Sequence, residues 1–477
     1  MRKKSVFFVA VLLAFALVGC GKGTNNQEIK SNQTKQVWSE NELLTDIPMM
    51  EGKHAKYSEI RDVGAKCWAV DVSDTTMEEY QSYLKTIEQE GFEKLVDNGK
   101  EGMEGFVYSA TYKKGARVLS INYITKVGLT TISIGENLEV SEHLFYKEQY
   151  VAENKANAKT TLTMLPIYES GNCFVLQLKN GHFIIQDGGL KEDYTFLMDY
   201  LDSLVPEGEK PVIEAWFISH DHHDHIGCLT AVIDDMKLAQ RVYVEGFYYS
   251  KPNAQVLNIS TQSLIAGQID TVFKLFKDTE GKRTKIYRPQ IGQRYYFSDI
   301  VVDIMYTQEQ LPFEQEYETF HDDRVVGMGV NYNDMSTWLR FTIDGQKLIF
   351  PGDSGIIVSI NAVVSYYDKE YFNVDFFQAP HHGSNTSTVV SDSFNCKTLL
   401  YSYYNTVGAM RKQDILEGTK QLQMKAQEVM CYGDGAKVFT FPYEVGTYEN
   451  LAEFASHIKD SVKKDSNYMI GIDDVLQ

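Results

Sequence analysis

The chain has 477 residues, and 43% of them are hydrophobic, which is enough for a large core and for two domains. Its formal net charge of −19 gives an acidic surface, which repels nucleic acids and anionic membranes. We therefore expect no tight, non-specific binding of nucleic acids, although a metal site can offset the repulsion locally.

Residues 1–20 have the pattern of a signal peptide. The basic start Met1–Lys4 precedes the apolar run Val6–Val18, which is too short for a comfortable transmembrane helix. The run ends at Cys20 in a sequence that resembles the lipobox of bacterial lipoproteins, and this implies lipidation of Cys20 after cleavage. The alternative is an ordinary secretory signal with an incidental cysteine. We expect a lipid anchor in the cell membrane, on its extracytoplasmic face, followed by a flexible tether over residues 21–55.

Residues 56–150 are predicted to form a small α+β domain. Thr75 and Glu78 have the spacing of a capping box, and the apolar face of the following helix ends at Gly91. The predicted strands are Cys67–Val72, Phe106–Tyr112, Arg117–Tyr123 and Leu129–Ile134. No residues in this domain have catalytic spacing, so packing, spacing and partner binding all stay open as its role.

A second domain is predicted over residues 160–445, followed by a helical tail over residues 446–477. Its first strands are Thr161–Ile167, Cys173–Leu178 and His182–Ile185, and the third leads into Asp187 and two glycines. A further strand, Val212–Ile218, leads into the run Ser219–His225, and a buried helix is predicted over Cys228–Ile233.

Four of the eleven histidines lie within Ser219–His225, interleaved with two aspartates. Imidazole nitrogens and carboxylate oxygens on one loop can converge on a borderline divalent metal. The candidate ligands are His220, His222, Asp224 and His225. The alternative is an exposed, histidine-rich stretch that binds metals only opportunistically, but such stretches lack the apolar flanks found here.

Two later strands also end in side chains that bind metals. The strand after Gln346 presents Asp353 at its C-terminal end, and the strand Val374–Pro380 presents His381, His382 and Ser384. A lone Gly-Asp or His-His pair is more often structural. Together with the histidine run, however, these two strand ends complete a ligand set for two metals.

The pattern His-x-His-x-Asp-His resembles the signature of the metallo-β-lactamase fold superfamily. The resemblance extends from Thr160 to Pro442, and it is closest to the hydrolase domain of the competence DNA-uptake channel protein and its stand-alone relatives. The phosphorylcholine esterases of bacterial cell-wall teichoic acids resemble it more loosely. The resemblance implies an α/β fold, an αββα sandwich, preceded here by the small α+β domain.

The resemblance also implies roles for individual residues. His220 and His222 would bind one metal, Asp224, His225 and His381 would bind the second, and Asp353 would bridge both. The implied cofactors are two divalent ions, zinc or manganese. Asp224 and His382 are the candidate catalytic residues, with His382 as a proton donor or a group behind the ligands, although a structural imidazole fits equally. The expected supporting residues are Asp187, Asn333, Ser336 and Ser384.

Two departures from the family pattern stand out. No histidine lies at Asn331 or Asn333, where many members carry a ligand of the first metal, and the nearest is His321. We therefore expect two metal sites of unequal affinity, because Asn333 offers at most a weakly binding amide oxygen. The alternative is that a loop brings in His321 as the substitute ligand, which would make both sites tight. Gly408–Met410 stands where relatives often have Gly-His-Pro, so a histidine on the substrate side is absent.

These features predict a membrane-anchored, binuclear metallohydrolase that cleaves phosphodiester bonds in nucleic acid or cell-wall polymers. Hydrolysis of a β-lactam or a lactone is the alternative among enzymes. A lipoprotein that uses the fold only for binding is the alternative of another class, but most of the expected ligands are present.

Overall fold

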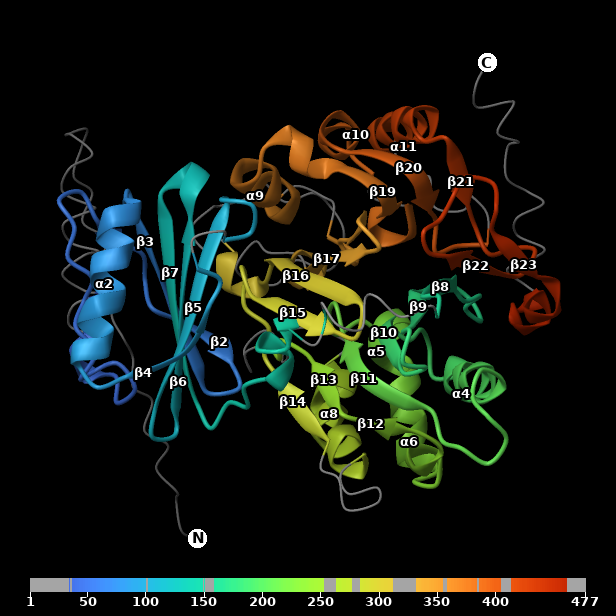
Figure 1. Cartoon of the computed structure of the whole chain (residues 1–477), viewed down its shortest axis with the longest axis horizontal. Helices are drawn as coiled ribbons and strands as arrows, with labels where there is room; N and C mark the ends of the chain where they lie inside the picture. The colour runs from blue at the N-terminus through green and yellow to red at the C-terminus, as the bar shows by residue number, and fades with distance from the viewer. Residues whose placement is uncertain are drawn as a thin grey trace, which may run out of the picture.

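The computed structural model describes residues 34, 37–99, 102–148, 150, 158–252, 263–276, 284–311, 332–354, 358–383, 386–404 and 413–460. Two units are visible in Figure 1, an N-terminal sheet with its helix and a larger domain of two sheets. Several residues singled out from the sequence lie outside the described residues, namely Cys20, His321, Asn331, Ser384 and Gly408–Met410. None of the described helices combines the length and the apolar composition of a membrane span.

Seven described strands form the N-terminal sheet, in the order β1-β3-β7-β6-β5-β4, with β2 beside β3. Their bounds are β1 Lys56–Tyr57, β2 Arg61–Gly64, β3 Cys67–Ser73, β4 Glu93–Asp97, β5 Val107–Lys114, β6 Arg117–Ile124 and β7 Leu129–Glu136. Helix α2, Met77–Gln89, covers one face of this sheet (Figure 1), where Tyr80 stacks on Tyr123 with ring centroids 5.4 Å apart.

The capping box of α2 lies one residue later than expected. Thr76 accepts a hydrogen bond from Glu79 N at 3.2 Å, and the Glu79 carboxylate accepts one from Thr76 N at 2.9 Å. Thr75 is buried, and its hydroxyl lies 2.9 Å from the hydroxyl of Thr130 on β7. The prediction of Thr75 and Glu78 was therefore wrong, because the sheet already uses the first threonine.

The segment before β1 packs against the N-terminal domain. The Trp38 indole donates to Ile47 O at 2.8 Å, and Tyr83 of α2 donates its hydroxyl to Pro48 O at 2.9 Å. The buried apolar residues of this segment are Trp38, Leu44, Ile47 and Met50. The prediction of a flexible tether was therefore wrong for residues 37–55.

The second domain contains two sheets that pack face to face. Nine described strands form the first, in the order β14-β13-β11-β10-β9-β8-β22-β23 with β12 beside β11, and seven form the second, in the order β15 to β21. The bounds in the first sheet are β8 Thr161–Met164, β9 Cys173–Gln177, β10 Phe183–Asp187, β11 Val212–Phe217, β12 Tyr243–Val244, β13 Gly246–Tyr248, β14 Lys285–Tyr287, β22 Ala436–Thr440 and β23 Glu449–Leu451. Those in the second are β15 Arg294–Phe297, β16 Ile300–Tyr306, β17 Trp338–Ile343, β18 Gln346–Phe350, β19 Asn373–Gln378, β20 Asn395–Leu400 and β21 Glu428–Met430.

Aromatic side chains join the two sheets, and helices cover their outer faces. Phe174 of the first sheet meets Phe350 of the second, with ring centroids 4.8 Å apart. The helices on the first sheet are α4 Asp193–Ser203, α5 His223–Ile226, α6 Ala231–Asp234 and α8 Ser263–Leu275. Those on the second are α9 Val358–Tyr366, α10 Thr388–Ser393 and α11 Gln413–Lys425. The predicted αββα sandwich is therefore confirmed. The helix expected over Cys228–Ile233 is a 3-10 turn, Gly227–Thr230, followed by α6.

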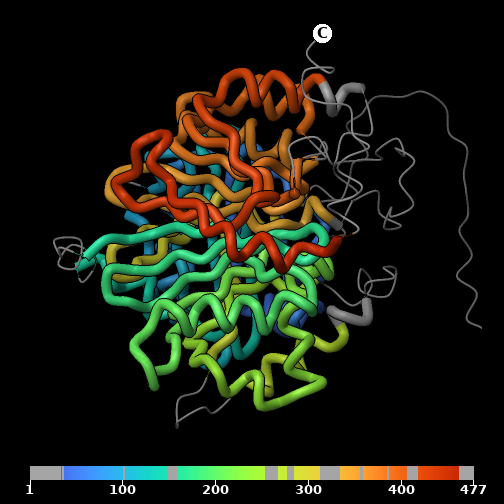
Figure 2. Tube along the Cα trace, turned by 90° about the vertical axis from the view of Figure 1, so that its right-hand side faces the viewer, coloured from blue at the N-terminus to red at the C-terminus, as the bar shows by residue number. Residues whose placement is uncertain are grey.

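The end of the described chain returns to the first sheet. Figure 2 shows β22 running beside β8, with which it pairs antiparallel, and β23 pairs with β22 in turn. The segment expected to be a helical tail therefore contains a strand, followed by the 3-10 helix Ala452–His457. His457 Nε2 lies 2.5 Å from Asp193 Oδ1, which holds this segment against α4.

The buried segment before β1 leads to a test of stability. Replacing Trp38 by alanine removes a large side chain that is only 4% exposed, so we expect the free energy of unfolding to fall by about 3 kcal/mol. The neighbouring Val37 is 44% exposed, and Val37→Ala is expected to change it by less than about 0.5 kcal/mol. Urea denaturation measures both. Equal stabilities of the two variants would indicate that this segment is a free tether.

Candidate metal centre

The histidine run spans the loop after β11 and the first turn of α5, at the end of the first sheet. His220, His222 and His225 are buried there, whereas His223 is exposed. His222 has an extended backbone (φ −69°, ψ 147°) and precedes the first turn of α5, which carries Asp224 and His225. Three of the four histidines of the run are thus turned into the protein.

Asp187 supports this loop from the neighbouring strand. It ends β10, and its carboxylate accepts hydrogen bonds from Ser219 N at 2.8 Å and from Ser219 Oγ at 2.9 Å. Asp187 Oδ2 also lies 2.8 Å from His225 Nδ1. A carboxylate on one ring nitrogen fixes the tautomer and leaves the other nitrogen for a metal. His225 Nε2 is therefore the ligand atom of this imidazole, and it lies 3.0 Å from Asp353 Oδ1.

Asp353 follows β18 on the second sheet, and the turn that presents it needs a glycine. Gly352 has φ +61°, and a Cβ there would lie 2.8 Å from Ser219 Cβ. Asp353 N donates to Ser336 Oγ at 3.2 Å, and Ser336 N donates to Asn333 O at 3.1 Å. Ser336 and Asn333 therefore hold the backbone that carries the carboxylate.

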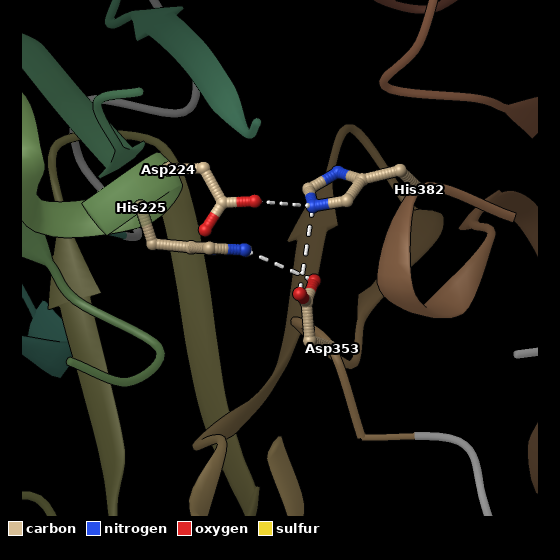
Figure 3. A group of neighbouring side chains, drawn as sticks. All are labelled: Asp224, His225, Asp353 and His382. Carbon is tan, nitrogen blue, oxygen red and sulfur yellow. Dashed lines mark hydrogen bonds and ion pairs between the residues drawn. The ribbon is translucent and has the colours of Figure 1, made fainter. Parts of the chain in front are cut away.

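The described residues contain two groups with metal-ligand spacing, and both include Asp353. One group is Asp224, His225, Asp353 and His382, and the other is His220, His222 and Asp353. Figure 3 shows the side chains of the first group pointing toward one another from the two sheets. His220 Nε2 lies 3.9 Å from Asp353 Oδ2, on the side of the second group. Asp353 is thus placed between the groups.

The structure places His382 rather than His381 in the first group. His382 Nε2 lies 3.1 Å from Asp224 Oδ2 and 3.4 Å from Asp353 Oδ2. His381 Nε2 lies 3.7 Å from Asp353 Oδ2, and its side chain is 27% exposed, compared with 7% for His382. Both residues have a left-handed backbone, with φ of 50° and 55°. This turn directs the His382 imidazole toward Asp224. The order of the two histidines in the sequence did not indicate which of them would do so.

The pKa values of the histidines at the site are shifted in opposite directions. Burial lowers the pKa of His222 to about 3 and holds that of His220 well below its usual value. Burial also acts against the charged form of His382, but the carboxylates of Asp353 and Asp224 outweigh it and raise the pKa of His382 to about 9. Burial likewise acts against the charged form of His225, but the neighbouring carboxylates, with Asp353 as the strongest, raise the pKa of His225 well above its usual value. Both shifts favour the protonated form of the two imidazoles that approach Asp353.

Several candidate metal-ligand atoms of the two groups are buried without a hydrogen-bond partner among the described residues. They are His220 Nε2, His225 Nε2 and both carboxylate oxygens of Asp353. The approaches of His225 and His382 to Asp353 are ion-pair contacts that lack the geometry of a hydrogen bond. Buried polar atoms are normally hydrogen-bonded, so unsatisfied ones at a shared point indicate a missing ligand. Imidazole nitrogens with carboxylate oxygens are the donors that zinc and related divalent ions take in proteins. The residues present therefore fit a divalent metal.

Two contacts of the site were missed from the sequence. Ser219 Oγ lies 3.0 Å from His220 Nδ1, and Asn172 Nδ2 lies 3.4 Å from His225 Nδ1. Ser219 directly precedes the first histidine, which is a usable signal. Asn172 precedes β9 in an ordinary polar turn, and nothing in its sequence neighbourhood indicates the site.

The raised pKa values predict how metal binding depends on pH. His225 and His382 must lose their protons to bind a metal, so a divalent ion that enters their group at about pH 7 is expected to release about two protons. The affinity should then rise with pH at least up to the pKa of about 9 at His382, because the pKa of His225 is also raised well above its usual value. Calorimetric titration with zinc in buffers of different ionisation enthalpy measures the release. A pH-independent affinity without proton release would contradict this assignment.

Residues 168–393 match the family model described as the metallo-beta-lactamase superfamily, slightly less than half of the chain. No curated protein matches significantly. One similar solved structure is a Thermotoga maritima protein assigned as a Zn-dependent hydrolase of this superfamily, with 11% identity, 50% of this chain and 74% of that chain covered, and a TM-score of 0.22. Zn(2+)-bound PqqB from Methylobacterium extorquens is 9% identical, with 57% of this chain and 97% of that chain covered and a TM-score of 0.34. A metallo-beta-lactamase from Hirschia baltica is 10% identical, with 62% of this chain and 70% of that chain covered and a TM-score of 0.17. The family match and the order of the ligand-bearing strand ends agree, and residues 168–393 are thus similar to the metallo-beta-lactamase superfamily.

Proposed function

We propose that the chain is a binuclear metallohydrolase that cleaves phosphodiester bonds. The observation that carries the proposal is the position of Asp353, which belongs to both groups of candidate ligands. A carboxylate shared in this way suits two ions about 3.5–4 Å apart, the spacing found in phosphatases and nucleases. The competing reaction, opening of a β-lactam or a lactone ring, has no specific feature of the described residues in its favour.

Bound divalent ions would activate a water molecule and neutralise negative charge on the phosphodiester oxygens. The protein supplies the frame for this chemistry. Asp224, His225 and His382 would hold one ion, and His220 and His222 the other, with Asp353 common to both. Zinc and manganese both accept such a donor set. The second group has one described ligand fewer, and a weaker site at that position stays a prediction.

In this scheme His381, and not His382, is the proton donor. His382 is enclosed by Asp224 and Asp353, so its ring nitrogen is occupied by the ligand group. His381 is the more exposed of the two imidazoles and still lies 3.7 Å from Asp353. We therefore assign the transfer of a proton to the leaving alkoxide to His381, which must first take up a proton because burial lowers its pKa.

The proposed reaction is tested with a chromogenic phosphodiester, bis(p-nitrophenyl) phosphate. We expect metal-dependent cleavage that falls by a factor of about 100 or more in His222→Ala and Asp353→Ala, since even groups behind the ligands contribute about 10–100-fold. The matched control is His223→Ala, because His223 belongs to the same loop but is exposed. Nitrocefin and a lactone are assayed in parallel. Hydrolysis of either one, without phosphodiesterase activity, would reverse the assignment.

We further propose that the enzyme is held on the outer face of the cell membrane by a lipid on Cys20. The support is the lipobox-like end of the apolar run Val6–Val18. Cys20→Ala is expected to move the protein out of the membrane fraction, whereas Cys67→Ala, which changes a buried thiol, should leave it there. Western blotting of fractionated cells distinguishes the two. A Cys20→Ala protein that stays in the membrane fraction would refute the lipid anchor.

A further inference from the structure

One carboxylate of the histidine run belongs to neither group of candidate ligands. Asp221 lies between His220 and His222 and is only 1% exposed. Its Oδ1 accepts a hydrogen bond from the hydroxyl of Tyr249, which is also buried. A buried carboxylate is costly unless it is hydrogen-bonded, so this bond fixes where the Asp221 side chain can lie. Asp221 lies at a bend of the chain between the two imidazoles. Holding its side chain therefore limits where the neighbouring His220 and His222 can lie.

Tyr249 itself is held by the segment that surrounds it. It directly follows β13, and its backbone N donates to Tyr287 O at 2.9 Å. The next two carbonyls are held as well. Ser250 O accepts from Gln308 Nε2 at 3.0 Å, and Lys251 O accepts from Arg288 Nη1 at 3.0 Å. The position of Tyr249 therefore depends on the side chains of Gln308 and Arg288.

The same two side chains also bind the N-terminal domain. Val63 O, on β2, accepts from Arg288 Nη2 at 2.6 Å and lies 3.4 Å from Gln308 Nε2. Arg288 is held in turn by an ion pair of 2.7 Å with Glu309, whose side chain is fully buried. In Figure 1, β2 lies on the side of the N-terminal sheet that faces β13 and β14. One pair of donors thus joins β2 to the segment of Tyr249.

The backbones of the two domains also meet directly at this point. Gly64, the last residue of β2, has φ +91°, and a Cβ there would lie 2.3 Å from Lys251 O. A side chain at this position cannot be accommodated without moving the strand or the segment after Tyr249. The close approach therefore requires glycine, and it makes the segment after Tyr249 sensitive to the position of β2.

We propose that Tyr249 is a positioning residue of the metal centre and that the N-terminal domain keeps it in place. In this view the N-terminal domain is part of the scaffold of the site. Strand β2 fixes Ser250 and Lys251, which directly follow Tyr249. Tyr249 in turn fixes Asp221, and Asp221 fixes the histidine loop. The inference rests on the metal centre of the proposed function, but it does not depend on the substrate.

The first test is the binding of cobalt to the metal-free, full-length chain, followed by its visible absorption. Tyr249→Phe keeps the ring and removes the hydroxyl that donates to Asp221, and we expect at least about a 10-fold weaker cobalt affinity and an altered spectrum. The matched control is Tyr248→Phe. Tyr248 is the preceding residue and is equally buried, but its hydroxyl lies 2.6 Å from Ser141 Oγ. The control should bind cobalt like the wild type.

The second test moves β2. Gly64→Ala is expected to weaken cobalt binding in the same direction, whereas Gly115→Ala should not, because Gly115 also has a positive φ (+61°) but has nothing within 4 Å of an added Cβ. Wild-type affinity and spectrum in Tyr249→Phe would overturn the role of Tyr249. Wild-type affinity in Gly64→Ala would overturn the role of the N-terminal domain. If Gly64→Ala does not fold, as judged by circular dichroism, the link from β2 to Ser250 is probed instead through Gln308→Ala, with the same expected loss.

The readout separates this inference from the proposed function. A wild-type chain that binds cobalt but cleaves no phosphodiester contradicts the substrate class and leaves both tests valid. A wild-type chain that binds no cobalt contradicts the metal centre itself, and the positioning role of Tyr249 then falls with it.

Discussion

The arrangement of the larger domain depends on one buried carboxylate. Asp353 is fully enclosed, and a charge in that position is tolerated only when opposite charges or a metal compensate for it. The compensating groups come from both sheets, His225 from the loop after β11 and His382 from the turn after β19. The two sheets must therefore meet with their strand ends in register at this point. This requirement explains why unusual backbone conformations gather here, at Gly352 and at both histidines after β19.

The groups around the site act mainly by orienting its donors. Asp187 fixes the tautomer of His225 from behind, and Ser336 fixes the backbone of Asp353. In the metal-free chain, protons on His225 and His382 supply the positive charge that the carboxylates require. A divalent ion would replace those protons with charge at the same place, so the site is organised before the metal arrives.

The two domains share more than a linker. A fully buried ion pair, Arg288 with Glu309, lies where β2 contacts the larger domain, and Arg340 of β17 pairs with Glu104 of the N-terminal domain at 2.9 Å. The buried Arg288–Glu309 pair has strict geometry, and together with the partly exposed Arg340–Glu104 pair it favours one relative placement of the domains over others. An N-terminal domain without catalytic spacing of its own can therefore still contribute to catalysis, by setting the position of a loop in its neighbour.

The sequence by itself determined the class of the fold and the loop that carries the site. Apolar runs of strand length, each followed by histidine or aspartate, indicate local burial and strand ends, and these signals do not depend on distant residues. Only the tertiary structure decided which imidazole of His381 and His382 faces Asp224, because both lie in a left-handed turn where alternation no longer applies. The packing of Trp38 and the bond from Tyr249 to Asp221 were equally hidden. Each joins residues that become neighbours only after the chain has folded, and local pattern carries no information about such pairs.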